Sequence, residues 1–229
     1  MRQPTAIERY DAWYDSPLGQ FCFAAEIALL RRGMGESAPS SILELGCGTG
    51  RFLLGLATNA STTVGVDQDC AMLEVARQRT SQNTRFTWMQ ADAASVPLPT
   101  SGFDVVFEST LLCLQRNPKP ILDEMVRLCR PGGTVVIGEL NPFSPWQLWR
   151  RAKARFGIGH FRNAHWHAPR QLMRILEQTG CAPRFVGRAV FCIPINRPDL
   201  AILRKATDAA GQRLWPWLGA YYVVAAEKR

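Results

Sequence analysis

Long apolar runs and a cysteine framework are both missing from this 229-residue sequence. No stretch approaches the roughly 18 consecutive apolar residues that a membrane-spanning helix requires. The first residues, MRQPTAIERYDAWYD, are acidic and aromatic where a secretory signal would carry a continuous apolar segment. The seven cysteines include no CxxC pair, and their odd number is typical of reduced thiols rather than of a disulfide or zinc framework. We therefore expect a cytoplasmic protein.

Histidine is scarce, and the three histidines, His160, His165 and His167, fall within eight positions. Two imidazoles at i and i+2 can bind zinc together only from an extended segment, and no cysteine or carboxylate lies near in sequence to complete a tetrahedral set. We therefore expect no metal. His165 is a candidate general base or substrate contact, because free histidine titrates near neutral pH, and a structural role is the alternative. His167 precedes a helix start at Ala168–Pro169, which indicates a capping or solvent-exposed residue.

Acidic residues are few in the C-terminal third of the chain. Residues 145–229 contain 15 Lys and Arg but only 4 Asp and Glu, a net charge of +11, whereas residues 1–144 carry a net charge of −3. Such a basic block is usually a solvated face. It can also mark a docking surface for a membrane, a nucleic acid or an acidic protein.

The segment PWQLWRRAKARFG, residues 145–157, predicts a short amphipathic helix inside this basic block. Trp146, Trp149 and Phe156 fall toward one side. The basic residues around the other side are Arg150, Arg151, Lys153 and Arg155. Aromatic anchors with a basic face suit an anionic membrane surface, which would make the protein peripheral at the membrane. An acidic carrier protein could dock on the same residues, and a core-packed helix with solvated arginines is the third interpretation.

Short β-rich runs alternate with helical stretches along the chain. Strands are predicted at 41–47, 62–67, 84–90, 103–109, 133–140, 184–193 and 219–227. Helices are predicted at 18–32, 50–60, 69–81, 118–130, 169–179 and 199–213. This alternation predicts an α/β fold with a doubly wound, seven-stranded, mostly parallel sheet covered on both faces, closed by an antiparallel last strand.

The carboxyl ends of the first two strands carry a pattern for ligand binding, which is where such sheets bind their ligands. The first strand runs into GCGTG, with glycines at 46, 48 and 50. The second strand ends in Asp67, 19 residues after Gly48, about where an acidic residue accepts hydrogen bonds from ribose hydroxyls. The spacing is G-x-G-x-G rather than G-x-G-x-x-G, and Glu44 just before the loop would repel a pyrophosphate. A ligand with a ribose and a cationic group but no phosphate, S-adenosylmethionine, therefore fits better than a dinucleotide.

Five motifs in this order resemble those of the class I S-adenosylmethionine-dependent methyltransferases, in the ubiquinone/menaquinone-methyltransferase-like (methyltransferase type 11) group. They are LELGCGTG, VGVDQDCAMLEVAR, QADAASVPLP, FDVVFESTLL and LCRPGGTVVIGE. The resemblance is clear over residues 41–140 and looser beyond. It implies a Rossmann-like methyltransferase fold in a single domain, 1–229. Its expected parts are an N-terminal helical lid (1–35), a cofactor-binding core (36–140), a cap over the acceptor pocket (141–168) and C-terminal helices with the last two strands (169–229).

The resemblance also implies roles for individual residues in cofactor binding. The methionine part of the cofactor would lie against Gly46 and Gly48, with its ammonium near Glu108 or near loop carbonyls. Asp67 would bind both ribose hydroxyls and Gln68 would cover the adenine. Asp92 would accept from the adenine amine, beside the Ala93 backbone. The expected cofactor set is Glu44, Gly46, Cys47, Gly48, Gly50, Asp67, Gln68, Asp92, Ala93 and Glu108.

The acceptor side is less defined by the sequence. Tyr10, Trp13 and Tyr14 are spaced to share one helix face, which predicts packing on the core or a lid over the site. A side-chain base is needed only for an acceptor that is protonated at neutral pH, and His165 is the catalytic candidate. The expected substrate contacts are Tyr10, Tyr14, Trp146 and His165.

The class of acceptor is narrowed by a turn that the sequence lacks. Nucleic-acid amino-methyltransferases of this fold carry an N/D-P-P-Y/F turn after the fourth strand, where this chain has ESTLLCL, so nucleic acid is disfavoured. We expect methyl transfer from S-adenosylmethionine to a small acceptor, lipophilic ones included, with S-adenosylhomocysteine as the product. The alternatives are a carrier-protein-linked or nucleic-acid substrate, or a module that binds S-adenosylmethionine without catalysis.

Overall fold

A seven-stranded sheet forms the centre of the computed structural model, which describes residues 3–36, 38–57, 59–155 and 164–229. The strand order is β3-β2-β1-β4-β5-β7-β6. The strands are β1 (Ser41–Leu45), β2 (Thr62–Asp67), β3 (Phe86–Gln90), β4 (Phe103–Ser109), β5 (Cys129–Leu140), β6 (Cys181–Ala189) and β7 (Tyr221–Lys228). β7 runs antiparallel to both β5 and β6, and the other pairs of neighbours are parallel. The predicted fold class, including the antiparallel last strand, is confirmed.

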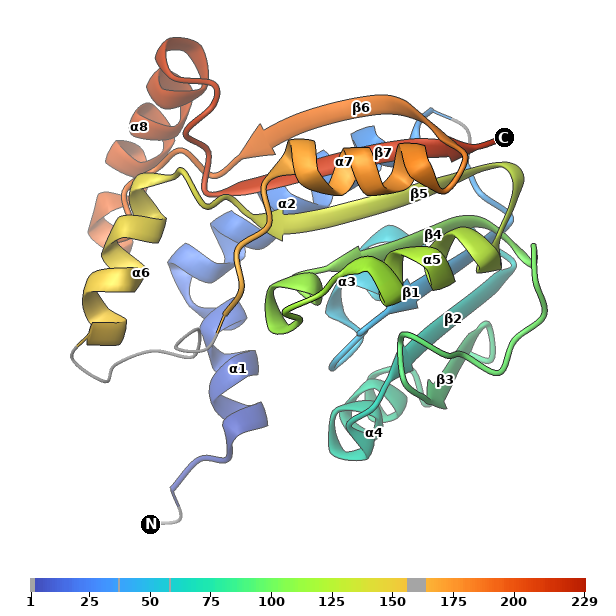
Figure 1. The fold of residues 1–229 in the computed structure, drawn as a ribbon. Coiled ribbons are helices and arrows are strands. Elements are labelled where there is room, and N and C mark those ends of the chain that lie inside the picture. The colour runs from blue at the N-terminus through green and yellow to red at the C-terminus, as the bar shows by residue number, and fades with distance from the viewer. Residues whose placement is uncertain (1–2, 37, 58, 156–163) are drawn as a thin grey trace.

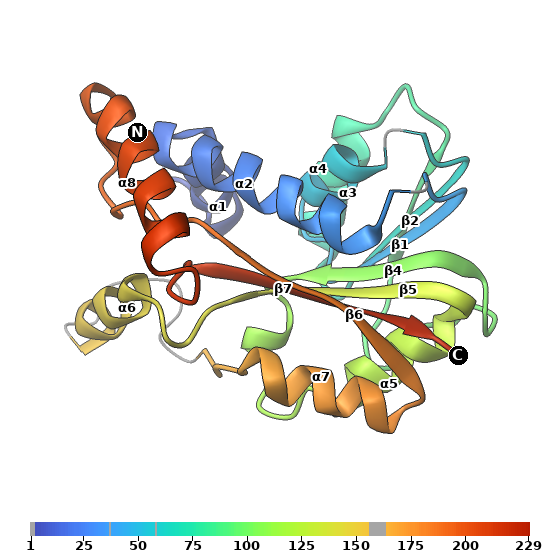
Figure 2. The ribbon, with the colours of Figure 1, turned by 90° about the horizontal axis from the view of Figure 1, so that it is seen from above.

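Helices cover both faces of this sheet (Figure 1 and Figure 2). One face carries α2 (Pro17–Met34), α3 (Arg51–Leu56) and α4 (Cys70–Arg79), and the other carries α5 (Lys119–Leu128) and α7 (Pro169–Gln178). Beyond the carboxyl edge of the parallel strands lie α1 (Ala6–Asp15), α6 (Pro145–Arg155) and α8 (Ala201–Leu214). Two short 3-10 helices complete the set, η1 (Leu112–Leu114) and η2 (Pro198–Leu200).

The central strands are apolar on both faces because each face is packed under helices. In β4, Val105 and Phe107 join the cluster under α2 and α3, whereas Val106 joins the cluster under α5 and α7. The strands therefore read as continuous apolar runs, as expected for a parallel sheet that is covered twice. This packing holds the sheet together, so the carboxyl ends of the neighbouring strands β3, β2, β1 and β4 lie at one edge.

Element limits differ from the prediction mainly at turns. β2 and β4 have the predicted bounds. β5 begins at Cys129, four residues before the predicted start, because Cys129 already pairs with Phe103 ahead of an irregularity in the ladder. β6 ends at Ala189 because Val190 has φ +62°, a left-handed conformation that cannot continue a strand.

None of the helices in the described parts of the chain has both the length and the apolarity needed to cross a bilayer.

Candidate active site

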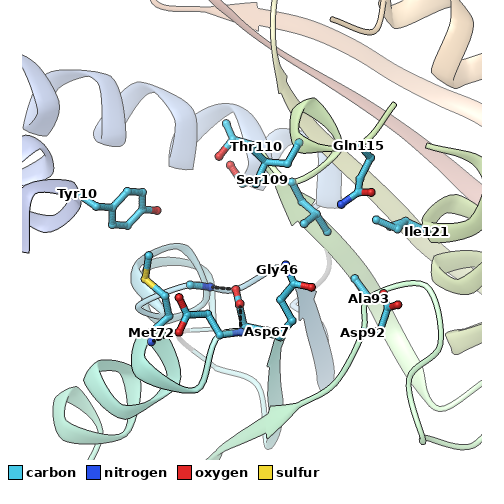
Figure 3. Close-up of a pocket in the computed structure, with 15 residues that line it drawn as sticks. Tyr10, Gly46, Asp67, Met72, Asp92, Ala93, Ser109, Thr110, Gln115 and Ile121 are labelled. Atoms are coloured by element: carbon cyan, nitrogen blue, oxygen red, sulfur yellow. Dashed lines mark hydrogen bonds between the residues drawn. The ribbon is translucent and has the colours of Figure 1, made fainter. Parts of the chain in front are cut away.

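A cavity of about 270 Å³ opens at the carboxyl ends of β1, β2, β3 and β4 (Figure 3). The loops after these strands provide most of the lining, and α1, α4, η1 and α5 contribute Tyr10, Met72, Leu114 and Ile121. Its lining residues are Tyr10, Gly46, Gly48, Asp67, Gln68, Asp69, Met72, Asp92, Ala93, Ser109, Thr110, Leu111, Leu114, Gln115 and Ile121. The strand ends that the sequence singled out therefore meet in one place.

The glycine loop after β1 forms the floor of the cavity. Gly46, Gly48 and Gly50 have φ values of +69°, +52° and +77°, in the region that favours glycine. A Cβ atom on Gly46 would lie 2.7 Å from Leu111, and one on Gly50 would lie 2.4 Å from Trp88. A Cβ on Gly48 would meet nothing nearer than the Tyr10 hydroxyl, at 3.9 Å. Packing thus accounts for two of the glycines, while Gly48 presents bare backbone to the cavity.

Asp67, at the end of β2, is held in place by backbone donors (Figure 3). Its Oδ2 accepts the N–H of Gly48 at 2.8 Å, and its Oδ1 accepts the N–H of Asp69 at 2.9 Å. Each carboxylate oxygen has two lone-pair directions, so each can accept one more hydrogen bond. One acceptor position on each oxygen therefore remains for a ligand in the cavity.

The loop after β3 contributes the far end of the cavity. Asp92 is exposed, and its Oδ1 accepts the N–H of Ala94 at 2.9 Å, which forms a side-chain turn around Ala93. Gln68 comes from the neighbouring loop, and its carbonyl accepts the side-chain amide of Gln90 at 3.1 Å. Asp92, Ala93 and Gln68 all line the cavity.

Two glutamates of the expected cofactor set lie in the interior and do not line the cavity. Glu44 accepts the N–H of Leu53 in α3 at 2.9 Å, and burial raises its pKa well above the ordinary value. Glu108 accepts the N–H of Leu111 at 2.9 Å, and burial together with the neighbouring Glu139 raises its pKa. Glu108 thus holds the loop after β4, whose Leu111 lines the cavity, and Glu44 holds α3, which follows the glycine loop.

Cys47 and Gly50 of the same set also lie outside the lining. The Cys47 side chain is buried, and its backbone N–H donates to Val66 at 2.9 Å. Gly50 is the residue before α3. Their contribution is to the shape of the glycine loop.

The two tyrosines of α1 occupy different environments. Tyr10 lines the cavity, and burial raises its pKa to about 12, so the phenol is neutral and can donate a hydrogen bond at pH 7. Tyr14 is buried, packs edge-on against Tyr10 with ring centroids 5.2 Å apart, and does not line the cavity. The helix face that the sequence predicts thus serves both packing and the cavity wall.

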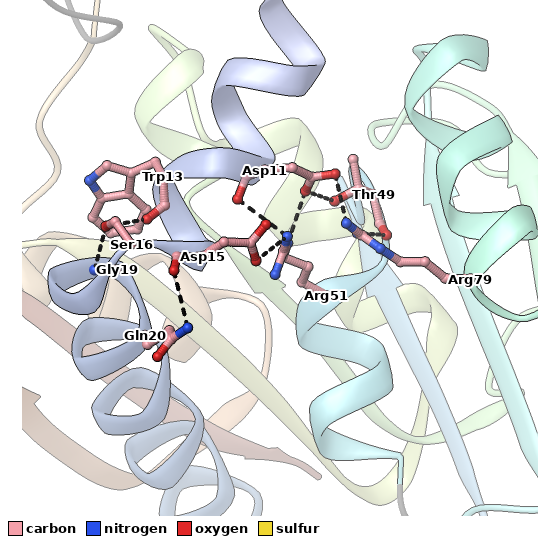
Figure 4. A network of polar contacts seen from close by, with 9 residues as sticks. All are labelled: Asp11, Trp13, Asp15, Ser16, Gly19, Gln20, Thr49, Arg51 and Arg79. Atoms are coloured by element: carbon pink, nitrogen blue, oxygen red, sulfur yellow. Dashed lines mark hydrogen bonds and ion pairs between the residues drawn. The ribbon is translucent and has the colours of Figure 1, made fainter.

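An ion-pair network joins α1 to the glycine loop (Figure 4). Asp11 accepts from Arg51 at 2.9 Å, from Thr49 at 3.0 Å and from Arg79 at 2.6 Å, and Asp15 pairs with Arg51 at 2.9 Å. Burial alone would raise the pKa of Asp11, but the bonds from Arg79 and Arg51 outweigh it and lower the pKa. No local sequence pattern indicates this network, since its members are separated by up to 68 residues.

The start of α6 packs inward. Trp146 is buried and donates from Nε1 to the carbonyl of Cys192 at 2.6 Å. The Arg150 guanidinium lies 5.3 Å from the Trp146 ring centroid, so these two residues share one side of the helix. That placement differs from the predicted separation of aromatic and basic faces. Trp149 is partly exposed, whereas Phe156 and the side chains of Lys153 and Arg155 lie outside the described residues.

The histidines separate into three cases. His160 lies outside the described residues. His165 is exposed, and its backbone N–H donates to Cys113 of η1 at 2.8 Å. The expectation of a capping or solvent role for His167 is wrong, because its side chain is buried and the helix start has no side-chain cap bond. Its Nε2 donates to the carbonyls of Leu112, at 3.1 Å, and Gln115, at 2.9 Å.

His167 therefore connects the end of the expected cap to η1, where Leu114 and the following residue Gln115 line the cavity. Its own carbonyl accepts from the Tyr222 hydroxyl at 2.8 Å. Across the described ranges, no group of three or more His, Cys, Asp or Glu side chains is placed to hold a metal ion.

Comparison with known proteins defines the class. Residues 43–137 match the family described as a methyltransferase domain. The chain is 33% identical over 183 residues to a malonyl-[acyl-carrier protein] O-methyltransferase of Serratia marcescens, covering 78% of this chain and 67% of that protein. It is 36% identical over 120 residues to a demethylmenaquinone methyltransferase of Clavibacter sepedonicus, covering 52% and 49%.

The fold has close counterparts among solved structures. A crystal structure of an S-adenosylmethionine-dependent methyltransferase from Thermotoga maritima superposes with a TM-score of 0.73 at 20% identity, covering 98% of this chain and 96% of that one. This sheet with its glycine loop defines a Rossmann-like methyltransferase fold. The chain belongs to the family of S-adenosylmethionine-dependent methyltransferases. It spans about half the length of several curated relatives that it matches, 56% in one case and 49% in another.

Proposed function

We propose that this protein transfers a methyl group from S-adenosylmethionine to a small acceptor, lipophilic ones included, and releases S-adenosylhomocysteine. The observation that carries this proposal is the charge of the cavity. Its lining includes the three aspartates Asp67, Asp69 and Asp92 and, among the described residues, no Lys, Arg or His. Such a lining suits a ligand with an ammonium and a sulfonium, and it repels the pyrophosphate of a dinucleotide.

The residues of the cavity fit the parts of this cofactor. The bare backbone of Gly48, together with Gly46, would bind the methionine part. The two free acceptor positions of Asp67 would bind the ribose hydroxyls. Gln68 and the turn at Asp92 and Ala93 would surround the adenine.

The main catalytic contribution required of the protein is to position the acceptor. The sulfonium of the bound cofactor supplies an electrophilic methyl group. The protein must then hold the acceptor in line at near-attack distance and exclude water, which can supply most of the rate enhancement. Tyr10 closes the cavity from α1, and η1 closes it from the side of the cap.

A base is required only when the acceptor loses a proton during transfer. His165 is the candidate, because it lies near the end of the expected cap and its backbone is bonded to η1 beside the cavity. Tyr10, Tyr14 and Trp146 are the other proposed acceptor contacts. Tyr14 and Trp146 are buried, so they would act by shaping the inner wall of the acceptor pocket.

An acceptor carried by an acidic carrier protein is the second candidate. It is supported by the similarity to a malonyl-[acyl-carrier protein] O-methyltransferase and by the net charge of +11 on residues 145–229. A protein that binds S-adenosylmethionine without transfer would show the same cavity, so binding alone does not separate these functions.

The test is transfer of a labelled methyl group from S-adenosylmethionine into a cell extract, followed by fractionation. Label in the solvent-extractable small-molecule fraction would support the proposal, and label in the protein fraction would favour a carrier-linked acceptor. Cofactor binding by calorimetry with no labelled product in any fraction would favour the non-catalytic alternative. Absence of cofactor binding would refute the assignment of the cavity.

A further inference from the structure

Six large apolar side chains are exposed on two segments at the carboxyl edge of the sheet. Phe143 lies just before α6, Leu148 and Trp149 lie in α6, and Leu214, Trp215 and Trp217 belong to the end of α8 and the loop after it. Their exposed fractions range from 42% for Trp149 to 67% for Leu148. Exposed apolar groups gathered in this way mark an interaction surface.

The two segments are bonded to each other. The Asn141 side-chain amide donates to the carbonyls of Trp217, at 2.9 Å, and Gly219, at 2.8 Å. Its oxygen accepts the N–H of Phe143 at 3.1 Å. Both views show the chain after α8 returning beside the start of α6 (Figure 1 and Figure 2). The exposed side chains therefore belong to one fixed region, which we name the aromatic edge.

The charge around the aromatic edge is positive. Residues 141–168 contain five Lys and Arg and no Asp or Glu. Arg151 follows the exposed residues of α6, and Arg213 precedes Leu214; both are exposed. Asp208 is the nearest acidic residue along α8, and its carboxylate accepts the N–H of Phe191 at 2.6 Å. The apolar groups thus lie beside cations that an anionic surface would attract.

We propose that the aromatic edge, with Arg151 and Arg213, docks this protein on an anionic membrane surface. Tryptophan has an apolar body and a polar N–H, which suits the boundary between lipid headgroups and acyl chains. The exposed side chains belong to α6, α8 and the loops beside them, which lie together at one end of the molecule, as insertion into a bilayer requires (Figure 2). A protein partner for the same region is an outcome of the test below.

Docking here would also bring the lipid surface to the carboxyl edge of the sheet, where the cofactor cavity opens. A lipophilic acceptor could then pass from the bilayer to the cap without crossing water. This consequence rests on the proposed function, whereas the docking surface itself does not.

The test is co-sedimentation of the full chain with vesicles of phosphatidylcholine alone and with vesicles that also contain phosphatidylglycerol. We expect binding to the anionic vesicles at low salt. We expect it to weaken as salt rises, because the screening length falls to about 8 Å at physiological ionic strength. The double variant Trp215→Ser/Trp217→Ser should bind at least about tenfold more weakly, since two apolar groups no longer enter the bilayer. Arg151→Gln/Arg213→Gln should lose about tenfold through reduced attraction to the anionic lipid.

Matched controls come from exposed residues elsewhere. Val186, 51% exposed on β6, and Arg174, exposed on α7, should tolerate Val186→Ser and Arg174→Gln with unchanged vesicle binding. Calorimetry of S-adenosylmethionine binding should give wild-type values for every variant, so a failure of the cofactor assignment is seen separately.

Three outcomes would overturn the docking surface. The wild-type protein could remain in the supernatant with anionic vesicles at low salt. The aromatic and arginine variants could sediment as strongly as the wild type. Binding to an acidic carrier protein could depend on these residues while vesicle binding is absent, which would assign the aromatic edge to a protein partner.

Discussion

Replacement of Asp67 tests the cofactor cavity most directly. Its carboxylate orients the glycine loop through the bond to Gly48 and leaves one acceptor position on each oxygen. A hydrogen bond to a charged group contributes about 1.5–3 kcal/mol. Asp67→Ala should therefore weaken S-adenosylmethionine binding by about 1.5–3 kcal/mol, a factor of roughly 10 to 150. Asp67→Asn keeps one acceptor oxygen and should give a smaller loss.

The assay is isothermal titration calorimetry with S-adenosylmethionine and S-adenosylhomocysteine, which share the ribose and should lose affinity together. Asp123→Ala is the matched control, because this carboxylate pairs with Lys119 on the exposed face of α5, away from the cavity. Each variant is first shown to be folded by its thermal transition. A folded Asp67→Ala protein with wild-type affinity would refute the ribose assignment.

Three further predictions concern α1, the histidines and metal. Asp11→Ala should lower the free energy of unfolding by about 1–2 kcal/mol, a modest loss because the ion pairs are partly exposed. The folded pKa of Asp11 is lowered, so this stabilisation is present above the ordinary pKa of 3.8 and is lost as pH falls below it. Denaturant titrations at several pH values measure the difference in unfolding free energy between the wild type and Asp11→Ala. A difference that stays unchanged at low pH would contradict the assignment. His167→Ala should lower the free energy of unfolding by about 1–3 kcal/mol, because the buried carbonyl of Leu112 and the partly buried carbonyl of Gln115 lose their donor, whereas His165→Ala should change it by less than about 0.5 kcal/mol and reduce turnover only if His165 acts on the acceptor. Zinc, nickel and EDTA should leave the melting temperature and the methyl transfer unchanged, and a stoichiometric metal in the purified protein would contradict this expectation.

Much of the fold could be predicted because its signals are local. Apolar runs such as FDVVFES mark strands that are buried on both faces, and β4 has the predicted bounds. The end of β6 could not be predicted in the same way. Nothing in the sequence shows that Val190 adopts a left-handed backbone, since its conformation depends on the bond from Ala220 to its carbonyl.

The candidate site also has features that the local sequence predicts and features that it does not. Gly46, Gly48 and Asp67 belong to two strand ends whose adjacency follows from the topology, so sequence reasoning could bring them together. Local pattern does not show whether a strand-end carboxylate faces the ligand or the interior, and Glu44 and Glu108 face the interior. Contacts between residues far apart in the sequence, such as Asp11 with Arg79, form only when the chain folds, so no local sequence pattern indicates them.

The cap is joined to the rest of the molecule at both of its ends. Asn141 and Trp146 bond at the start to the chain near Trp217 and Cys192, and His165 and His167 bond at the far end to η1. Sequence changes between these two attachments need not displace η1 or the wall that it gives to the cofactor cavity. We propose that this segment contributes to the acceptor site, so exchanging it between relatives should change acceptor preference while cofactor binding stays unchanged.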